Sequence, residues 1–204
     1  MTNRRQWTPE ELITFEKTIA DDFNEGKIRA PIHLSGGNEM QLIEIFNDVG
    51  DDDWIATTWR SHYHCLLRGV PPNRLRDDIL AGRSITLCYP DFKIFSSAIV
   101  GGILPIALGI AWSIKRAGGK NKVWAFLGDM TAQTGTFEEC SKYAFAFDLP
   151  ITWIVEDNQK SVCTDTKKVW NLPIEAVGWG DVRFIKYEYV LGWPHSGAGK
   201  RINF

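Results

Sequence analysis

The chain has 204 residues, of which 44% are hydrophobic, and a formal net charge of −2 at pH 7. This length and apolar content are enough for a full hydrophobic core, and we expect a single domain over residues 1–204. The near-neutral charge gives no electrostatic case for binding nucleic acid. The four cysteines lack the spacing of a metal site, so we expect reduced thiols in or near a core.

The sequence gives no sign of membrane insertion or secretion. Its most apolar stretch, residues 99–112, is too short to cross a bilayer and contains Pro105. The N-terminal residues lack the apolar run of a signal peptide. We therefore expect a cytoplasmic protein without membrane contact. Nine tryptophans indicate a partner surface as well as a core.

The first half of the chain alternates helix signals with less regular segments. Thr8, Pro9 and Glu11 form a capping box with proline at the first helical position, and Gly26 can end that helix. The patterns then predict a helix over 38–47, a strand over 54–59, a helix over 71–82, and over 86–97 an irregular loop covering the site.

The second half contains a strand–helix–strand unit. Residues 123–127 and 151–156 are apolar runs typical of buried strands, and residues 136–147 between them are helical in pattern. Residues 100–115 predict another helix, whose small residues permit close packing, and 183–190 predict a last strand. We expect an α/β fold, with an open, mostly parallel sheet and helices on both faces.

Gly128-Asp129-Met130 follows the first of these strands, and Asp157-Asn158 follows the second after 26 intervening residues. In a parallel crossover unit, the carboxyl ends of both strands lie at one edge of the sheet, where open α/β sheets bind ligands. A carboxylate, an amide oxygen and a helix N-terminus suit a divalent cation that holds a diphosphate. The spacing therefore predicts such a site at this edge.

These motifs resemble those of the thiamine diphosphate enzymes, most closely the alpha subunit of the 2-oxo-acid dehydrogenase components. That family carries Gly-Asp-Gly and, about 26 residues later, Asn-Asn. The N-terminal domain of transketolase is a more distant resemblance. Further blocks resemble the family in order and cover roughly residues 30–165: His33 to Glu39, Trp59 to His62, Arg68-Gly69, and Ile99 to Gly109.

The resemblance implies a set of site residues and one diphosphate-binding, alpha-like domain over 1–204 with an N-terminal helical extension. Asp129, Asn158 and the backbone carbonyl of Lys160 would hold Mg²⁺ or Ca²⁺. His33 and His62 would move protons near the reacting centre. The residues implied in binding thiamine diphosphate are Trp59, Arg60, Ala98, Val100, Gly128, Asp129, Met130, Thr131 and Asn158.

Two residues depart from the family pattern, and one expected residue is missing. Met130 stands in place of the third motif glycine, and Asp157 in place of the first asparagine. The family's activating glutamate belongs to a separate pyrimidine-binding domain, for which this chain has no room. The resemblance therefore implies a beta-like partner subunit that carries this glutamate, in an alpha2-beta2 heterotetramer acting on a small keto substrate.

The reaction that the resemblance favours is oxidative decarboxylation of a 2-oxo acid. One alternative is a split transketolase-like enzyme, because Asp157-Asn158 followed by Ser161-Val162 also resembles that family. A second alternative is a non-catalytic regulatory subunit, with cofactor binding weakened at Met130. A dinucleotide-binding Rossmann domain is disfavoured because no Gly-x-Gly-x-x-Gly follows the first strand.

Overall fold

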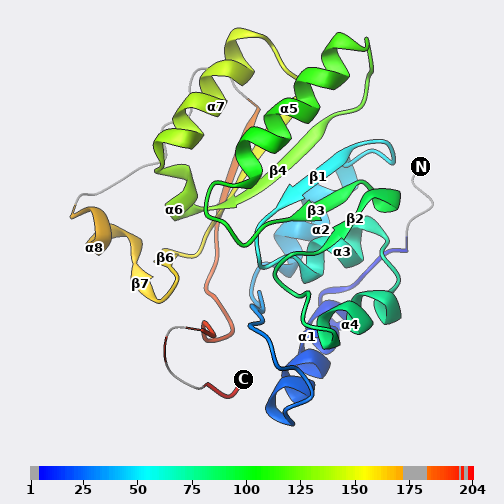
Figure 1. Ribbon diagram of the computed structural model, residues 1–204, viewed down its shortest axis with the longest axis vertical. Helices are drawn as coiled ribbons and strands as arrows, with labels where there is room; N and C mark the ends of the chain where they lie inside the picture. The colour runs from blue at the N-terminus through cyan, green and yellow to red at the C-terminus, as the bar shows by residue number, and fades with distance from the viewer. Residues whose placement is uncertain (1–4, 172–182, 198, 200–201) are drawn as a thin grey trace. The chain divides into compact units, whose positions relative to one another are not determined.

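Two compact units make up the chain in a computed structural model, which describes residues 5–171, 183–197, 199 and 202–204. Unit 1 comprises Met1–Val49, Trp59–Ala98 and Val190–Phe204, and unit 2 comprises Gly50–Thr58 and Ile99–Tyr189. Figure 1 labels the helices and strands of both units. A single diphosphate-binding domain over 1–204 with an N-terminal helical extension stays a prediction.

A parallel sheet forms the centre of unit 2. Its strands are β1 (Trp54–Thr57), β4 (Val123–Gly128), β5 (Ile151–Asp157) and β8 (Phe184–Glu188), each hydrogen-bonded in parallel to the next. Every residue of β5 is buried, which is the pattern of a central parallel strand. The predicted α/β fold with a mostly parallel sheet is confirmed, as are the strands expected over 123–127, 151–156 and 183–190.

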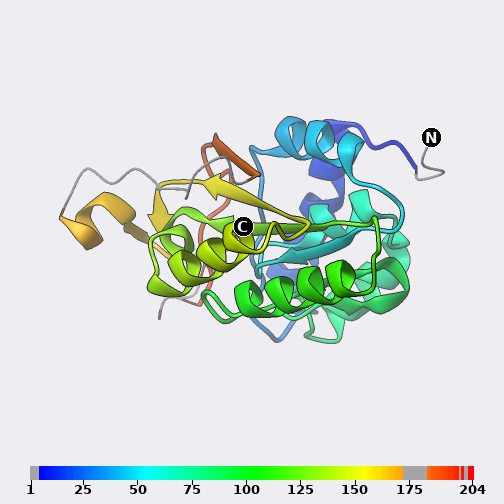
Figure 2. The same cartoon turned by 90° about the horizontal axis from the view of Figure 1, so that it is seen from above.

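Two helices pack together on one side of this sheet, as Figure 2 shows. α5 (Ile103–Arg116) contacts β1, β4 and β5, and α7 (Gly135–Ala146) lies beside α5. The buried Ala107 and Ala111 of α5 permit this close packing, and the Phe137 ring of α7 lies 5.6 Å from the Trp153 ring of β5. No helix among the described residues is long and apolar enough to span a membrane.

Four helices form most of unit 1: α1 (Pro9–Asn24), α2 (Glu39–Asp48), α3 (His62–Arg68) and α4 (Pro72–Leu80). α1 contacts the other three, and residues such as Leu12, Leu42 and Leu66 form the core between them. The capping box of α1 is present, because the Thr8 side chain accepts from the Glu11 N–H and the Glu11 carboxylate accepts from the Thr8 N–H.

The prediction of an irregular loop over residues 86–97 is wrong. A hairpin is formed there by β2 (Cys88–Tyr89) and β3 (Ile94–Ser96), joined by the 3₁₀ turn η1 (Pro90–Phe92). Lys93 closes the turn with φ of 52°, a left-handed conformation that is unusual for lysine. These strands have two and three residues, so no period-two pattern could reveal them.

Several short elements were not predicted. α3 has all seven residues buried, so it lacks the polar face by which an amphipathic helix is recognised. Four elements of unit 2 were missed for a different reason, because they are too short to show a periodic pattern. They are α6 (Asp129–Ala132), β6 (Lys160–Ser161), β7 (Thr164–Asp165) and α8 (Thr166–Trp170).

The four cysteines are free thiols, as expected from their spacing. Cys65 and Cys140 are buried, and burial raises the pKa of the Cys140 thiol to about 11. Cys88 and Cys163 are exposed, so the expectation of a place in the core holds only for the first pair.

Asp53 joins β1 to the start of β4 and is 6% exposed. Its carboxylate accepts hydrogen bonds from the N–H groups of Gly50 and Lys122 and from the Trp124 indole, at 2.7–2.8 Å. We expect Asp53→Ala to lower the free energy of unfolding by about 2–3 kcal/mol, because it leaves buried donors unpaired. Urea denaturation measures this, with the exposed neighbour Asp52→Ala as control. Equal midpoints for both variants would contradict the prediction.

Candidate cation and cofactor site

The register of β4 and β5 brings the two motifs to one edge of the sheet. Gly128, the last residue of β4, lies opposite Glu156 of β5. The next residues are Asp129, which begins α6, and Asp157, which ends β5 and is paired with Glu188 of β8. The two carboxylates therefore lie at the same end of neighbouring strands, and Asn158 follows. This is the geometry that the spacing of the motifs predicted.

Asp129 begins α6 and is buried, at 8% exposed. Burial raises the pKa of its carboxyl to about 6, and the charge of Asp157 acts in the same direction. The Thr166 side chain and the N–H groups of residues 129 and 130 act in the opposite direction. A cation bound next to this buried carboxylate would favour its charged form.

Asn158 occupies a tight turn after β5. Its Oδ1 accepts the Lys160 N–H at 3.0 Å, and its Nδ2 donates to the Tyr189 hydroxyl at 3.2 Å. These two contacts fix the orientation of the amide, and the turn holds residue 160 next to Asn158. The side-chain oxygen keeps a second lone pair that could serve a cation.

The donor set fits Mg²⁺ bound together with a diphosphate. Among the described residues there is no cluster of three or more His, Cys, Asp or Glu that could hold a metal alone. A cation here would instead use one carboxylate, amide and carbonyl oxygens, and phosphate oxygens, the hard ligands that Mg²⁺ prefers. A Cβ added to Gly128 would meet nothing within 4 Å, so the strand end is open to a ligand.

Unit 2 contains four more of the predicted site residues. Met130 and Thr131 lie in α6, where the Met130 N–H is turned toward the Asp129 carboxylate. Lys160 is exposed at the start of β6. Val100, 48% exposed, lies just before α5.

A second group of predicted residues comes together in unit 1, around Arg60. One arm of its guanidinium donates to the Leu34 carbonyl at 2.6 Å, and the other lies 3.2 Å from Nδ1 of His195. Arginine has only donors, so Nδ1 of His195 must accept, and His195 is neutral with its proton on Nε2. The His195 ring stacks on the His33 ring, with centroids 4.3 Å apart.

His195 has a more central place than the sequence indicated. It is not among the residues predicted for the site, and hydrogen bonds on both sides of it hold its segment in place. The Gly192 N–H donates to the Gly36 carbonyl at 3.0 Å, and the Ser196 hydroxyl donates to the Ile32 carbonyl. A histidine followed by serine near the end of the chain was the signal that could have found it.

His33 is buried, at 8% exposed, and burial lowers the pKa of its imidazole to about 3. The charge of the nearby Arg60 guanidinium acts in the same direction. His33 is therefore neutral at physiological pH, and it would offer a hydrogen bond rather than a positive charge. Trp59 is half-buried with its ring centroid 6.0 Å from that of His33, and Ala98 is half-buried at the end of its segment.

His62 lies in a different buried network of unit 1. Its Nε2 is 2.9 Å from the Ser84 hydroxyl, and its Nδ1 is 3.7 Å from the Glu16 carboxylate, with all three side chains at 0% exposure. Glu16 also accepts the Ser35 N–H at 2.9 Å. This network joins α1, α3 and the residues after α4, and the role of His62 in proton transfer stays a prediction.

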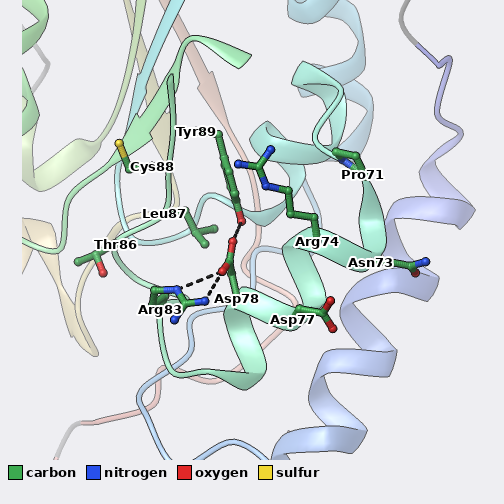
Figure 3. A pocket seen from close by; sticks show the side chains of 10 residues that line it. All are labelled: Pro71, Asn73, Arg74, Asp77, Asp78, Arg83, Thr86, Leu87, Cys88 and Tyr89. Carbon is green, nitrogen blue, oxygen red and sulfur yellow. Dashed lines mark hydrogen bonds and ion pairs between the residues drawn. The ribbon is translucent and has the colours of Figure 1, made fainter. Parts of the chain in front are cut away.

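A pocket of about 670 Å³ opens beside α4 and the β2–β3 hairpin (Figure 3). Arg83 in this pocket pairs with Asp78, which also accepts from the Tyr89 hydroxyl at 2.7 Å. Arg74 pairs with Asp91 at 2.5 Å. The pocket contains none of the predicted site residues, and its paired charges cross-link its walls.

The profile of the family described as "Dehydrogenase E1 component" matches residues 10–176, which is most of the chain. The chain belongs to the dehydrogenase E1 component family. The resemblance to its alpha subunits, predicted from the motifs, is confirmed, and the matched region of this E1-family chain includes both strand-end motifs.

Curated relatives agree with this assignment. The alpha subunit of acetoin:2,6-dichlorophenolindophenol oxidoreductase from Cupriavidus necator is 29% identical over 154 residues, covering 71% of this chain and 46% of that protein. The pyruvate dehydrogenase E1 alpha subunit from Porphyra purpurea is 26% identical over 165 residues, covering 72% and 48%. The acetoin:2,6-dichlorophenolindophenol oxidoreductase alpha subunit from Bacillus subtilis is 28% identical, covering 72% of this chain and 47% of that protein. The chain spans about half the length of these relatives.

The lowered pKa of His33 predicts that the free energy of unfolding decreases as the pH falls below about 6.5. Below about pH 6.5 the unfolded chain protonates His33 and the folded chain does not, so the cost reaches at most about 1.4 kcal/mol per pH unit. We expect this loss between pH 6.5 and 5, and a shallower slope in His33→Gln. Urea denaturation across this window measures both slopes, and equal slopes would contradict the prediction.

Proposed function

We propose that this chain is the diphosphate- and cation-binding, alpha-like subunit of a heteromeric thiamine diphosphate enzyme that cleaves a bond next to a ketone carbonyl. The observation that carries the proposal is the parallel register of β4 and β5, which places Asp129 and Asn158 at one strand edge in a chain of the E1 family. Bound thiamine diphosphate would supply the electron sink for that cleavage.

The roles of the residues in unit 2 follow from their chemistry. The Asp129 carboxylate, the Asn158 amide oxygen and the Lys160 carbonyl are the proposed ligands of Mg²⁺, or of Ca²⁺. The cation and the amides of Met130 and Thr131 would hold the diphosphate. Gly128 leaves space for the phosphates, because no side chain projects from the strand end.

The residues of unit 1 have the proposed role of binding anionic and polar groups of cofactor or substrate. Arg60 is a permanent positive charge that suits phosphate oxygens. Neutral His33 and His195 would orient polar groups of cofactor or substrate through ring N–H and N atoms. Trp59 and Ala98, and Val100 of unit 2, would contact the cofactor by analogy with the family.

A beta-like partner that supplies the activating glutamate is supported by the glutamates of this chain. The buried glutamates among the described residues are Glu16, Glu39 and Glu156. Glu16 accepts the Ser35 N–H, Glu39 accepts the Gly37 N–H and the Tyr63 hydroxyl, and Glu156 accepts the Tyr187 hydroxyl. Each is thus engaged in holding its own unit together, which favours an activating glutamate from a second chain.

Two substrate classes are supported by the relatives. The proteins named above act on acetoin or carry the name of pyruvate dehydrogenase, and both pyruvate and acetoin have a bond to be broken next to a ketone. We propose 2-oxo-acid oxidative decarboxylation first, in a cytoplasmic alpha2-beta2 complex. The split transketolase-like alternative has less support, because the family match is to the E1 component.

Turnover by the chain co-expressed with a beta-like subunit separates these reactions. The assay compares pyruvate, branched-chain 2-oxo acids, acetoin and ketose phosphates. Turnover of ketose phosphates alone would favour the transketolase-like alternative. Turnover of none of them, together with no binding of thiamine diphosphate and Mg²⁺ by the complex, would favour the regulatory alternative.

Asp129→Asn should weaken binding of thiamine diphosphate at saturating Mg²⁺ by at least about tenfold, because the cation loses its charged protein ligand. Isothermal titration calorimetry measures this in the full chain. Asp148→Asn, which makes the same chemical change at a carboxylate 85% exposed in unit 2, serves as the control and should bind like the wild type. Binding by Asp129→Asn at wild-type affinity would contradict the proposed ligand set.

A further inference from the structure

The carboxyl ends of β4 and β5 carry one carboxylate more than the family pattern has there. Asp157 stands where the family has asparagine. Burial raises the pKa of the neighbouring Asp129 carboxyl, and the charge of Asp157 acts in the same direction. Two neighbouring carboxylates would repel each other and would also repel an incoming diphosphate. The extra charge at Asp157 therefore needs a counter-charge if this edge is to bind a phosphate ligand.

Lys186 supplies that counter-charge from the neighbouring strand. It lies on β8, opposite Val155 of β5, and its Nζ is 2.9 Å from Oδ2 of Asp157. The lysine side chain is 32% exposed, whereas that of Asp157 is 11% exposed, so the ion pair is partly shielded from water. The pairing with Asp157 raises the pKa of Lys186, which keeps the ammonium charged at neutral pH.

The second oxygen of Asp157 is also engaged. Oδ1 accepts the Gln159 N–H at 2.9 Å, in the same turn in which Asn158 accepts the Lys160 N–H. Both carboxylate oxygens of Asp157 thus have partners within unit 2. Lys186 also lies 3.8 Å from the exposed carboxylate of Glu188, a longer contact than the 2.9 Å to Asp157. Asp129, Asp157 and Lys186 together carry one net negative charge, as a single carboxylate would.

We propose that Lys186 is a positioning residue of the cation and diphosphate site: it holds Asp157 out of the cation's ligand set and cancels its charge. The Asp157–Lys186 pair takes the place of the amide that the family has at this position. This inference rests on the proposed function, because it assigns Lys186 a role at the proposed cofactor site.

The proposal predicts opposite changes in two affinities when the ammonium is removed. In Lys186→Met, two uncompensated carboxylates would attract a bare divalent cation more strongly. The same two charges would repel the diphosphate of the cofactor. A variant that merely loosened the structure would weaken both ligands together, so the opposite signs separate an electrostatic role from a structural one.

The experiment titrates the chain, co-purified with its beta-like subunit, with Mn²⁺ alone and, separately, with thiamine diphosphate at saturating Mg²⁺. For Lys186→Met we expect affinity for Mn²⁺ to rise and affinity for thiamine diphosphate to fall, each by about three- to tenfold for one partly exposed charge. Lys186→Arg keeps the charge and should bind both ligands like the wild type. Asp157→Asn/Lys186→Met removes both charges and should restore both affinities.

A matched control removes a lysine from an exposed ion pair elsewhere in unit 2. Lys142 pairs with Glu138 on α7 at 3.4 Å, and Lys142→Met should leave both affinities unchanged. The inference is overturned if Lys186→Met binds both ligands like the wild type, or if both affinities fall and the double variant does not restore them. If the wild type binds no thiamine diphosphate at millimolar concentration, the proposed function fails, and the inference fails with it.

Discussion

The parallel pairing of β4 with β5 is the constraint on which the candidate site depends. The backbone hydrogen bonds along this pair fix the register, so Gly128 lies opposite Glu156, and Asp129 and Asp157 follow at the same end of the two strands. A shift by one residue would turn the buried side chains of β5 to the other face. The full burial of β5 therefore also fixes the place of Asp129 relative to Asn158.

Buried polar groups determine the chemistry that each unit can perform. In unit 2, the Asp129 carboxylate is buried beside a second acid, so a positive charge stabilises it. In unit 1, burial and the nearby guanidinium of Arg60 keep His33 and His195 neutral. The acidic edge of unit 2 is thus suited to a cation, and the neutral histidine pair of unit 1 lies beside a fixed positive charge.

The central part of the fold could be predicted from the sequence because its signals are local. The apolar runs of β4 and β5, the helix between them and the motifs at their ends all follow from patterns within a few residues. The hairpin after α4 and the buried helix α3 were missed because they have too few residues or no polar face. The place of His195 could not be predicted, because it depends on contacts of its segment with residues 32–36, far away in the sequence.

The Lys186–Asp157 pair also could not be predicted from the sequence. Asp157 is visible in the sequence as a departure from the family pattern, but the residue that offsets its charge lies on β8, 29 positions further along. Only the pairing of β8 with β5 brings the two together. Substitutions in a motif are therefore best interpreted together with the strand that lies next to it.

The central claim is that Asp129 and Asn158 hold a cation that binds the diphosphate. A crystal structure with Mn²⁺ and thiamine diphosphate, in which anomalous scattering locates the metal, tests it most directly. The account predicts Mn²⁺ bound to the Asp129 carboxylate, the Asn158 amide oxygen and the diphosphate, with Asp157 still paired to Lys186. Mn²⁺ at any other place, or bound by Asp157 instead of Asp129, would contradict it.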